Sequence, residues 1–267
     1  MAHERDDLLD QVHVLLDEGK PDRASALCRR GLRRFPRDAD LWFSLGDSLF
    51  EEGRIEQADK AFRRAVEHRA GWAMALARRA ETSLWMGRML RAKNLLEAAY
   101  EADRDLPFTT WLRAVFCDAR GDHAEAAFWY ARAQRLDPEA YFAPLTLSLD
   151  EFHLEFMDGV RHLLESPCVK ASLAATEWVV LDRVDTSYED LAECPPPVGC
   201  YLVPTPEAGA PDEASGMVHP PIGRGYVFAR NILRQCRSRE DVPTQVYLAV
   251  MDDLQSFTYN EFEEGGA

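Results

Sequence analysis

Glycine recurs every 34 residues in the first half of this chain. The four positions are Gly19, Gly53, Gly87 and Gly121. Each glycine is followed by an alanine five residues on, a larger residue four beyond that, and a small residue three further still. These sets are Ala24, Ala58, Ala92 and Ala126; Cys28, Phe62, Leu96 and Tyr130; and Gly31, Ala65, Ala99 and Ala133. A motif of this length in register over four units predicts a solenoid, in which each unit covers the apolar face of the next.

The repeat resembles the tetratricopeptide repeat (TPR), which has a pair of antiparallel helices in each unit. The first helix of the second unit carries the family's pattern of large and small residues at Trp42, Leu45, Gly46 and Leu49. Small residues let the paired helices approach closely, and the recurring glycine ends one helix and turns the chain. The expected fold of residues 1–140 is therefore an α-helical TPR solenoid. Its four repeats are predicted near residues 5–38, 39–72, 73–106 and 107–140.

TPR proteins bind partners in a groove lined mostly by the first helix of each repeat. In this chain the resemblance places the groove positions at Phe43, Asp47, Phe50, Met74, Glu81, Trp85, Phe108, Trp111 and Asp118. Aromatic side chains with acidic neighbours favour an amphipathic helix or an extended peptide as ligand. The alternative is that some of these aromatic side chains pack between repeats. The family's clamp of Lys, Asn and Arg for a C-terminal carboxylate does not match this chain, so we do not expect that ligand.

Five arginines lie on and just after the second helix of the first unit: Arg29, Arg30, Arg33, Arg34 and Arg37. Such a run is usually a solvated face, and the alternative is a docking patch for an acidic partner. The chain's own second half is one candidate for that partner, because residues 141–267 carry 21 acidic and 8 basic side chains. Nucleic acid is not an expected partner, because the whole chain has a net charge of -15.

The sequence also indicates the cellular compartment in which the protein is expected. No run approaches the roughly 18 apolar residues that a membrane span requires. The N-terminus lacks a basic region followed by an apolar core, so no secretory signal is visible. The six cysteines form no CxxC pair, which favours reduced thiols over a zinc ribbon or a disulfide framework. We expect a cytoplasmic protein without membrane insertion.

Residues 141–267 lose the repeat and predict a small α+β domain. Ser148 to Glu151 has the pattern of a helix N-terminus, with a capping residue and early acids. The expected elements are a helix from Ser148 to Leu164, strands at 176–181 and 225–229, a helical turn at 231–235 and a final helix at 240–257. A segment rich in proline and glycine at 204–223 is predicted to be a mobile surface loop.

The order of these elements, with Gly199-Cys200-Tyr201 before the loop, resembles the minimal zincin-like metallopeptidase domain of bacteria. That resemblance implies a final helix bearing HExxH, whose histidines bind zinc and whose glutamate activates water. This chain has Met251-Asp252-Asp253-Leu254-Gln255 there instead, with Met251 and Gln255 in place of the histidines and Asp252 in place of the glutamate. Thioether and amide groups are poor zinc ligands. We therefore expect a degenerate domain, a pseudoenzyme with neither metal nor cofactor.

The pairing of the two units resembles RomY-like bacterial polarity regulators, which act with a Ras-like GTPase and its activating protein. The favoured function is a non-enzymatic adaptor or regulator. In it the TPR groove binds a partner helix or peptide, and the degenerate domain is a second binding or regulatory module. Two alternatives remain: a metal-dependent peptidase with atypical ligands, and a TPR chaperone for a secreted client.

Overall fold

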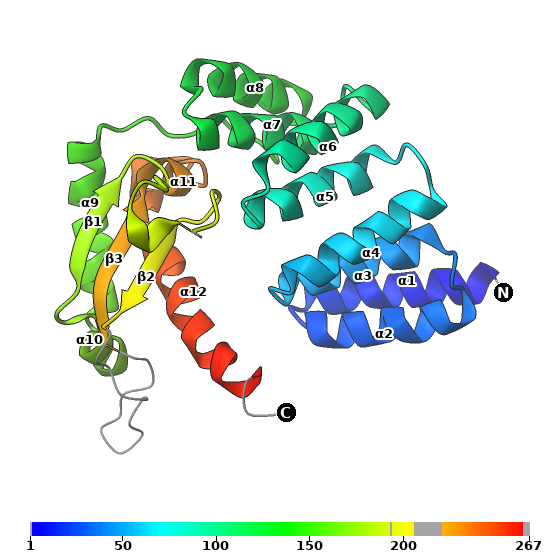
Figure 1. Cartoon of the computed structure of the whole chain (residues 1–267), viewed down its shortest axis with the longest axis horizontal. Helices are drawn as coiled ribbons and strands as arrows, with labels where there is room; N and C mark the ends of the chain where they lie inside the picture. The colour runs from blue at the N-terminus through cyan, green and yellow to red at the C-terminus, as the bar shows by residue number, and fades with distance from the viewer. Residues whose placement is uncertain (1, 193, 206–220, 264–267) are drawn as a thin grey trace. The chain divides into compact units, whose positions relative to one another are not determined.

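The computed structural model describes residues 2–192, 194–205 and 221–263 of the chain. It divides into two compact units, Met1–Tyr141 and Phe142–Ala267, so the boundary lies one residue beyond the predicted end of the repeats. Figure 1 shows helices alone in the first unit and a small sheet with helices in the second.

The described part of the first unit consists of eight helices in four antiparallel pairs, one pair in each predicted repeat. They are α1 (Ala2–Asp17), α2 (Pro21–Arg34), α3 (Ala39–Glu51), α4 (Ile55–His68), α5 (Ala73–Trp85), α6 (Met89–Ala102), α7 (Pro107–Arg120) and α8 (His123–Leu136). The predicted helical repeat array is confirmed.

The recurring glycine ends the first helix of every pair. All four positions have a positive φ, for example 73° at Gly53 and 82° at Gly121. An L-residue with a side chain would be strained in this left-handed conformation by about 1–2 kcal/mol. The turn also satisfies helix-terminal carbonyls, because Gly53 N donates to Phe50 O at 2.9 Å and Arg54 N to Leu49 O at 2.9 Å.

The repeats stack through both helices of each pair. At the first and third junctions the first helix of one repeat contacts the first helix of the next: α1 contacts α3, and α5 contacts α7. Each second helix packs against the first helix of the following repeat: α2 against α3, α4 against α5 and α6 against α7. Arg78 of α5 also pairs with Asp47 of α3, so the first helices α1, α3, α5 and α7 form one row, which we call the inner row.

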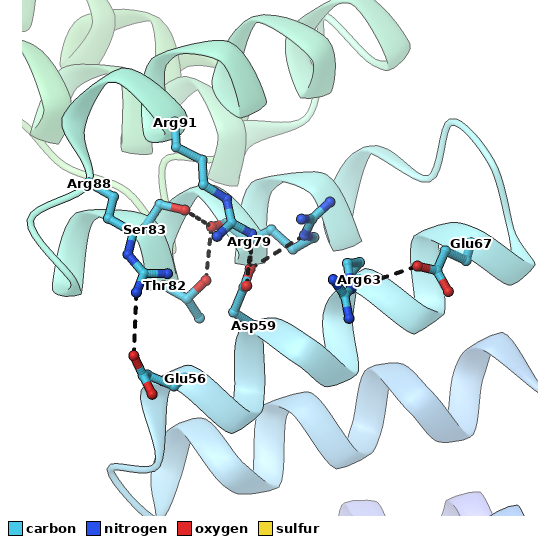
Figure 2. Close-up of polar contacts among 9 residues, drawn as sticks. All are labelled: Glu56, Asp59, Arg63, Glu67, Arg79, Thr82, Ser83, Arg88 and Arg91. Carbon is cyan, nitrogen blue, oxygen red and sulfur yellow. Dashed lines mark hydrogen bonds and ion pairs between the residues drawn. The ribbon is translucent and has the colours of Figure 1, made fainter.

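A buried carboxylate joins the second repeat to the third. Asp59 of α4 is 7% exposed, and both of its oxygens lie 2.7 Å from Nη2 of Arg91 in α6. Nε of Arg79 in α5 lies 3.4 Å from the same carboxylate. Figure 2 shows the two guanidinium groups converging on Asp59, with a separate, exposed ion pair between Arg88 and Glu56 nearby.

The second unit contains a three-stranded sheet and four α-helices in its described part. The strands are β1 (Glu177–Leu181), β2 (Cys200–Pro204) and β3 (Ile222–Phe228), and the helices are α9 (Leu149–Leu163), α10 (Pro167–Leu173), α11 (Ala229–Leu233) and α12 (Val242–Glu263). The strand order is β1-β3-β2, with β1 parallel and β2 antiparallel to β3. Short 3-10 turns lie at Glu189–Leu191 and Arg239–Asp241.

Most of the helices and strands predicted for this unit are present in the structure. Helix α9 begins at the predicted cap, where Glu151 N donates to Ser148 Oγ and Ser148 N donates to the Glu151 carboxylate. The helix packs against α12, so that Phe152, Phe156 and Val246 share one core. Strand β2 and helix α10 were not predicted from the sequence.

The predicted loop at 204–223 overlaps the end of β2 and the start of β3. Pro204 ends β2, and residues 222 and 223 begin β3. Residues 206–220 of that prediction lie outside the described residues. Among the described helices, none is long and apolar enough to cross a membrane.

Candidate functional site: the inner row of the repeat array

Arg78 of α5 occupies the middle of the inner row and joins two repeats. Its Nη2 lies 2.8 Å from Asp47 Oδ1 on α3, and its Nη1 lies 2.5 Å from Glu81 Oε2 one turn further along α5. The Arg78 side chain is only 16% exposed, and those of Asp47 and Glu81 are 26% and 15% exposed. These ion pairs are therefore shielded from bulk water more than a typical surface pair.

Aromatic rings surround the same guanidinium. The Arg78 Cζ atom lies 4.7 Å from the ring centroid of Phe50, 5.5 Å from that of Phe62 and 5.9 Å from that of Phe108. Trp85 meets Phe50 edge-on, with 6.3 Å between the ring centroids. Cation–π contacts and ion pairs together fix Arg78 in place.

The charges around Arg78 do not balance, because two carboxylates face one guanidinium. Asp47 and Glu81 occupy the same position in successive repeats, 34 residues apart, and share the one guanidinium of Arg78. Burial raises the pKa of both carboxyl groups, and Arg78 offsets only part of that rise. Burial acts to lower the pKa of Arg78, but the two carboxylates outweigh it and raise that pKa. Glu51 adds a further negative charge close by.

A second aromatic group continues the inner row into the fourth repeat. The rings of Phe108 and Trp111 are stacked, with 6.4 Å between centroids and 15° between planes. Tyr141 lies beyond them, 6.2 Å from Trp111. Phe108 thus belongs both to this group and to the surroundings of Arg78, and the aromatic surface extends over α3, α5 and α7.

We use the name inner-row cluster for the residues that the structure brings together here. They are Asp47, Phe50, Arg78, Glu81, Trp85, Phe108 and Trp111. Six of these seven are predicted groove positions.

The other three predicted positions lie apart from the cluster. Phe43 packs against Phe62 and Trp72 of its own repeat, with 5.4 Å and 4.6 Å between the ring centroids. Asp118 is 4% exposed and pairs with Nδ1 of His123 at 3.2 Å, at the turn after α7, so it is not open to a ligand. Met74 is half-buried at the start of α5.

Sequence reasoning missed Arg78, the central residue of the cluster. Its importance depends on Asp47, a partner 31 residues away on another helix. The sequence contains one indication of this role. An acidic residue recurs at positions 47 and 81, and Arg78 lies one helical turn before Glu81.

The predicted arginine patch on α2 is exposed at all five positions. Arg34 pairs with Glu4, and Arg29 Nη1 lies 3.5 Å from Ser25 Oγ. Within the described part of the chain, Arg30, Arg33 and Arg37 have no ion-pair partner. Both interpretations of this patch, solvated face and docking surface, remain open.

The predicted positions of the degenerate metal motif lie on α12 and face different surroundings. Met251 packs against the core, whereas Asp252 and Gln255 are exposed. The neighbouring Asp253 accepts a hydrogen bond from Leu202 N on the edge strand β2 at 2.6 Å. Burial raises the pKa of Asp253 to about 6. The described residues contain no group of three or more His, Cys, Asp and Glu side chains arranged to hold a metal ion.

Comparisons with known proteins agree with the repeat geometry. Residues 9–75 match the family described as Tetratricopeptide repeat, which spans the first two repeats and the start of the third. The first unit is thus a repeat array of tetratricopeptide type. No curated protein matches the chain.

Solved structures include several similar folds. MamA from Desulfovibrio magneticus RS-1 is 21% identical, with a TM-score of 0.44 over 59% of this chain and 85% of that one. YrrB, a TPR protein with an unusual peptide-binding site, is 14% identical, with a TM-score of 0.41 over 59% and 76%. The first TPR of Spaghetti (RPAP3), bound to an HSP90 peptide, is 16% identical, with a TM-score of 0.40 over 49% and 96%.

Proposed function

We propose that this protein is a non-enzymatic adaptor whose inner-row cluster binds a helix or an extended peptide of a protein partner. The observation that carries this proposal is the set of half-buried aromatic rings around Arg78, extending over three repeats. A TPR-type array performs no chemistry through its scaffold, so its function depends on the surface that the first helices present.

The composition of the cluster suits protein recognition. Tryptophan and arginine are enriched among the residues that contribute most to protein–protein affinity, particularly where neighbouring groups exclude water. In the cluster, Trp85 and Trp111 supply large apolar surfaces at low entropic cost, because each has only two rotatable side-chain bonds. Arg78 is already held by Asp47 and Glu81, so it is preorganised and loses little freedom when a partner binds.

The second unit is proposed to be a second binding or regulatory module, a zincin-like domain that has lost its catalytic motif. The support is chemical, because Met251 and Gln255 are weak zinc ligands at the two positions where the resemblance implies histidines. The resemblance to RomY-like regulators makes a Ras-like GTPase and its activating protein the first partners to test.

The test uses affinity capture with the full chain from its host, followed by mass spectrometry. A specific partner should be retained by the wild-type protein and lost by a Trp85→Ala/Trp111→Ala double variant. Phe128→Ala is the matched control, because Phe128 is an aromatic residue of the same unit that is 55% exposed on α8. Thermal unfolding of all three proteins checks that the fold is intact.

Three outcomes would contradict the adaptor proposal. Equal capture by the wild type and the double variant would show that the inner-row cluster is not the binding surface. Stoichiometric zinc in the purified protein, together with peptide hydrolysis abolished by a chelator, would favour the peptidase alternative. Capture of a single secreted client and no other protein would favour the chaperone alternative.

A further inference from the structure

Arg113 of α7 has an unusual environment for a half-buried cation. Its Cζ atom lies 4.2 Å from the ring centroid of Trp129 on α8 and 4.7 Å from that of Tyr100 on α6. Within the part of the chain that the structure describes, the guanidinium donates no hydrogen bond and has no carboxylate within ion-pair distance. The rings thus hold the cation in place and leave its N–H groups unused.

Equivalent positions in successive repeats show which charge has changed next to Arg113. Arg79 stands one repeat earlier, 34 residues before Arg113, and both take the place of the buried Leu45 of the second repeat. Arg79 faces the carboxylate of Asp59, as Figure 2 shows. The residue equivalent to Asp59 in the next repeat is Lys93. The third junction therefore keeps the arginine and replaces its carboxylate with a second cation.

The nearby Glu125 does not take over the role that the Asp59 carboxylate has one junction earlier. Glu125 is the equivalent of Arg91, the second cation on Asp59. Its carboxylate accepts a hydrogen bond from Nε1 of Trp129 at 3.2 Å and forms no ion pair with Arg113.

A small pocket opens beside Arg113 between α6, α7 and α8. Its volume is about 190 Å³, and Leu96, Phe116 and Trp129 supply its apolar lining. Three cations line it, namely Lys93, Arg113 and Arg120, against the carboxylates of Glu97 and Glu125. Lys93 is 3.9 Å from Glu97, and Arg120 pairs with Asp122 at 3.3 Å, so among the described residues Arg113 is the lining cation that forms no ion pair.

We infer that this pocket binds the carboxylate of an acidic side chain on a protein partner, with Arg113 as its principal contact. A guanidinium offers parallel N–H groups that match the two oxygens of a carboxylate. The pocket is below the roughly 300–1,000 Å³ typical of sites for cofactors and drug-sized molecules, so its size suits one side chain. The site involves α6 and α8 as well as α7, and it is separate in composition from the inner-row cluster.

The probe is acetylated, amidated penta-glutamate, titrated against the full chain and followed by the indole N–H resonance of Trp129 in NMR. We expect a saturable shift despite the net charge of -15, which disfavours non-specific binding of an anionic peptide. Arg113→Gln should weaken the affinity about tenfold or more, because charge-assisted hydrogen bonds are lost. The Trp85→Ala/Trp111→Ala variant should bind the probe as the wild type does, so this test is independent of the adaptor test.

A second variant tests the comparison between repeats. Lys93→Asp places a carboxylate where Asp59 stands one repeat earlier, so it should pair with Arg113, abolish binding of penta-glutamate and raise the melting temperature. Lys60→Asp is the matched control: it makes the same charge change at an exposed position of α4 and should leave binding unchanged.

Several results would overturn the inference. One is failure of the wild type to bind penta-glutamate saturably, and another is equally tight binding of penta-glutamine. Unchanged affinity in Arg113→Gln would place the peptide elsewhere. A saturable response to inorganic phosphate without a response to penta-glutamate would assign the pocket to a different anion.

Discussion

Gly46 of α3 lies directly against the ring of Phe62 on α4. A Cβ atom built at position 46 would stand 2.5 Å from both Cδ1 and Cε1 of that ring, and Phe62 is fully buried. The two helices of the second repeat approach this closely only because residue 46 has no side chain. The same contact explains why a small residue in one helix faces a large residue in its partner.

Gly46→Ala should therefore destabilise the protein by about 1–3 kcal/mol, the usual cost of overpacking. Helix propensity alone predicts the opposite sign, a gain of roughly 0.5–1 kcal/mol, because alanine is favoured within a helix. Urea unfolding decides between the two effects. In a Phe62→Leu background, which has a smaller side chain at this contact, Gly46→Ala should cost less stability than it does in the wild type. A stabilising effect of Gly46→Ala in the wild type would refute the packing argument.

Arg78→Met should cost about 3–5 kcal/mol of unfolding free energy at pH 7, because two shielded carboxylates lose their cation. The exposed Arg63, 3.7 Å from Glu67, provides the matched control, and Arg63→Met should cost less than about 1 kcal/mol. The pKa values of Asp47 and Glu81, already raised by burial, should rise further in the variant.

The pH dependence of that loss gives a separate check. With raised pKa values, the folded Arg78→Met variant takes up protons before the unfolded chain does as the pH falls. Its deficit against the wild type should therefore shrink from pH 7 towards pH 4. A deficit that is constant over this range would show that lost packing, and not charge, causes the destabilisation.

Asp253→Asn should make the second unit less sensitive to pH. The folded pKa of Asp253 is about 6, above the value of about 3.9 for an unperturbed aspartate. Between these values the folded state holds more protons than the unfolded state, so wild-type stability falls as the pH rises, by roughly 3 kcal/mol in all. Asparagine removes the charge and keeps an acceptor for Leu202 N, so the variant should be the more stable protein at pH 8.

The control for this experiment is Glu165→Gln, which removes a carboxylate at an exposed position. Its stability should follow the wild-type curve between pH 4 and pH 8. If Asp253→Asn also keeps the wild-type slope over that range, another group is responsible for it.

The five cysteines with described side chains should react slowly with a thiol reagent in the native protein. All five are buried. Burial raises the pKa of Cys28, Cys117, Cys194 and Cys236 to about 12 each, and that of Cys200 well above its ordinary value. The thiolate, which is the reactive form, is therefore scarce at pH 8.

The rate should be measured with a chromogenic disulfide on a Cys168→Ser background, so that only these five thiols report. Urea should release each thiol as the elements around it unfold, together with the loss of helical signal. A thiol that reacts quickly in the native state would reveal local opening around it.

The repeat array could be predicted from the sequence because its determinants are local and recur. A left-handed glycine, such as Gly53 with φ 73°, and a buried alanine, such as Ala58, are dictated by backbone sterics and helix contact, whatever the partner is. Strand β2 had no such signal. Cys200 to Pro204 is a strand because it pairs with β3, and this partner lies beyond a long proline-rich segment.

The candidate site was only partly predictable for the same reason. The aromatic positions Phe50, Trp85 and Trp111 followed from the resemblance to a family. Arg78 and Arg113 did not, because the role of each depends on side chains contributed by neighbouring helices. Only comparison between equivalent positions, such as Asp59 with Lys93, shows where one junction differs from the next.

Because the second and third junctions between repeats differ, we expect the repeats of the array to open in a definite order. Asp59 joins the third repeat to the second through two arginines, whereas the fourth repeat packs beside Arg113, which forms no ion pair with any residue that the structure describes. Since a repeat array opens at its weakest interface, α7 and α8 should exchange their amide hydrogens before α3 and α4. An acidic side chain bound at Arg113 would slow that exchange, so a partner could set how much of the array stays closed.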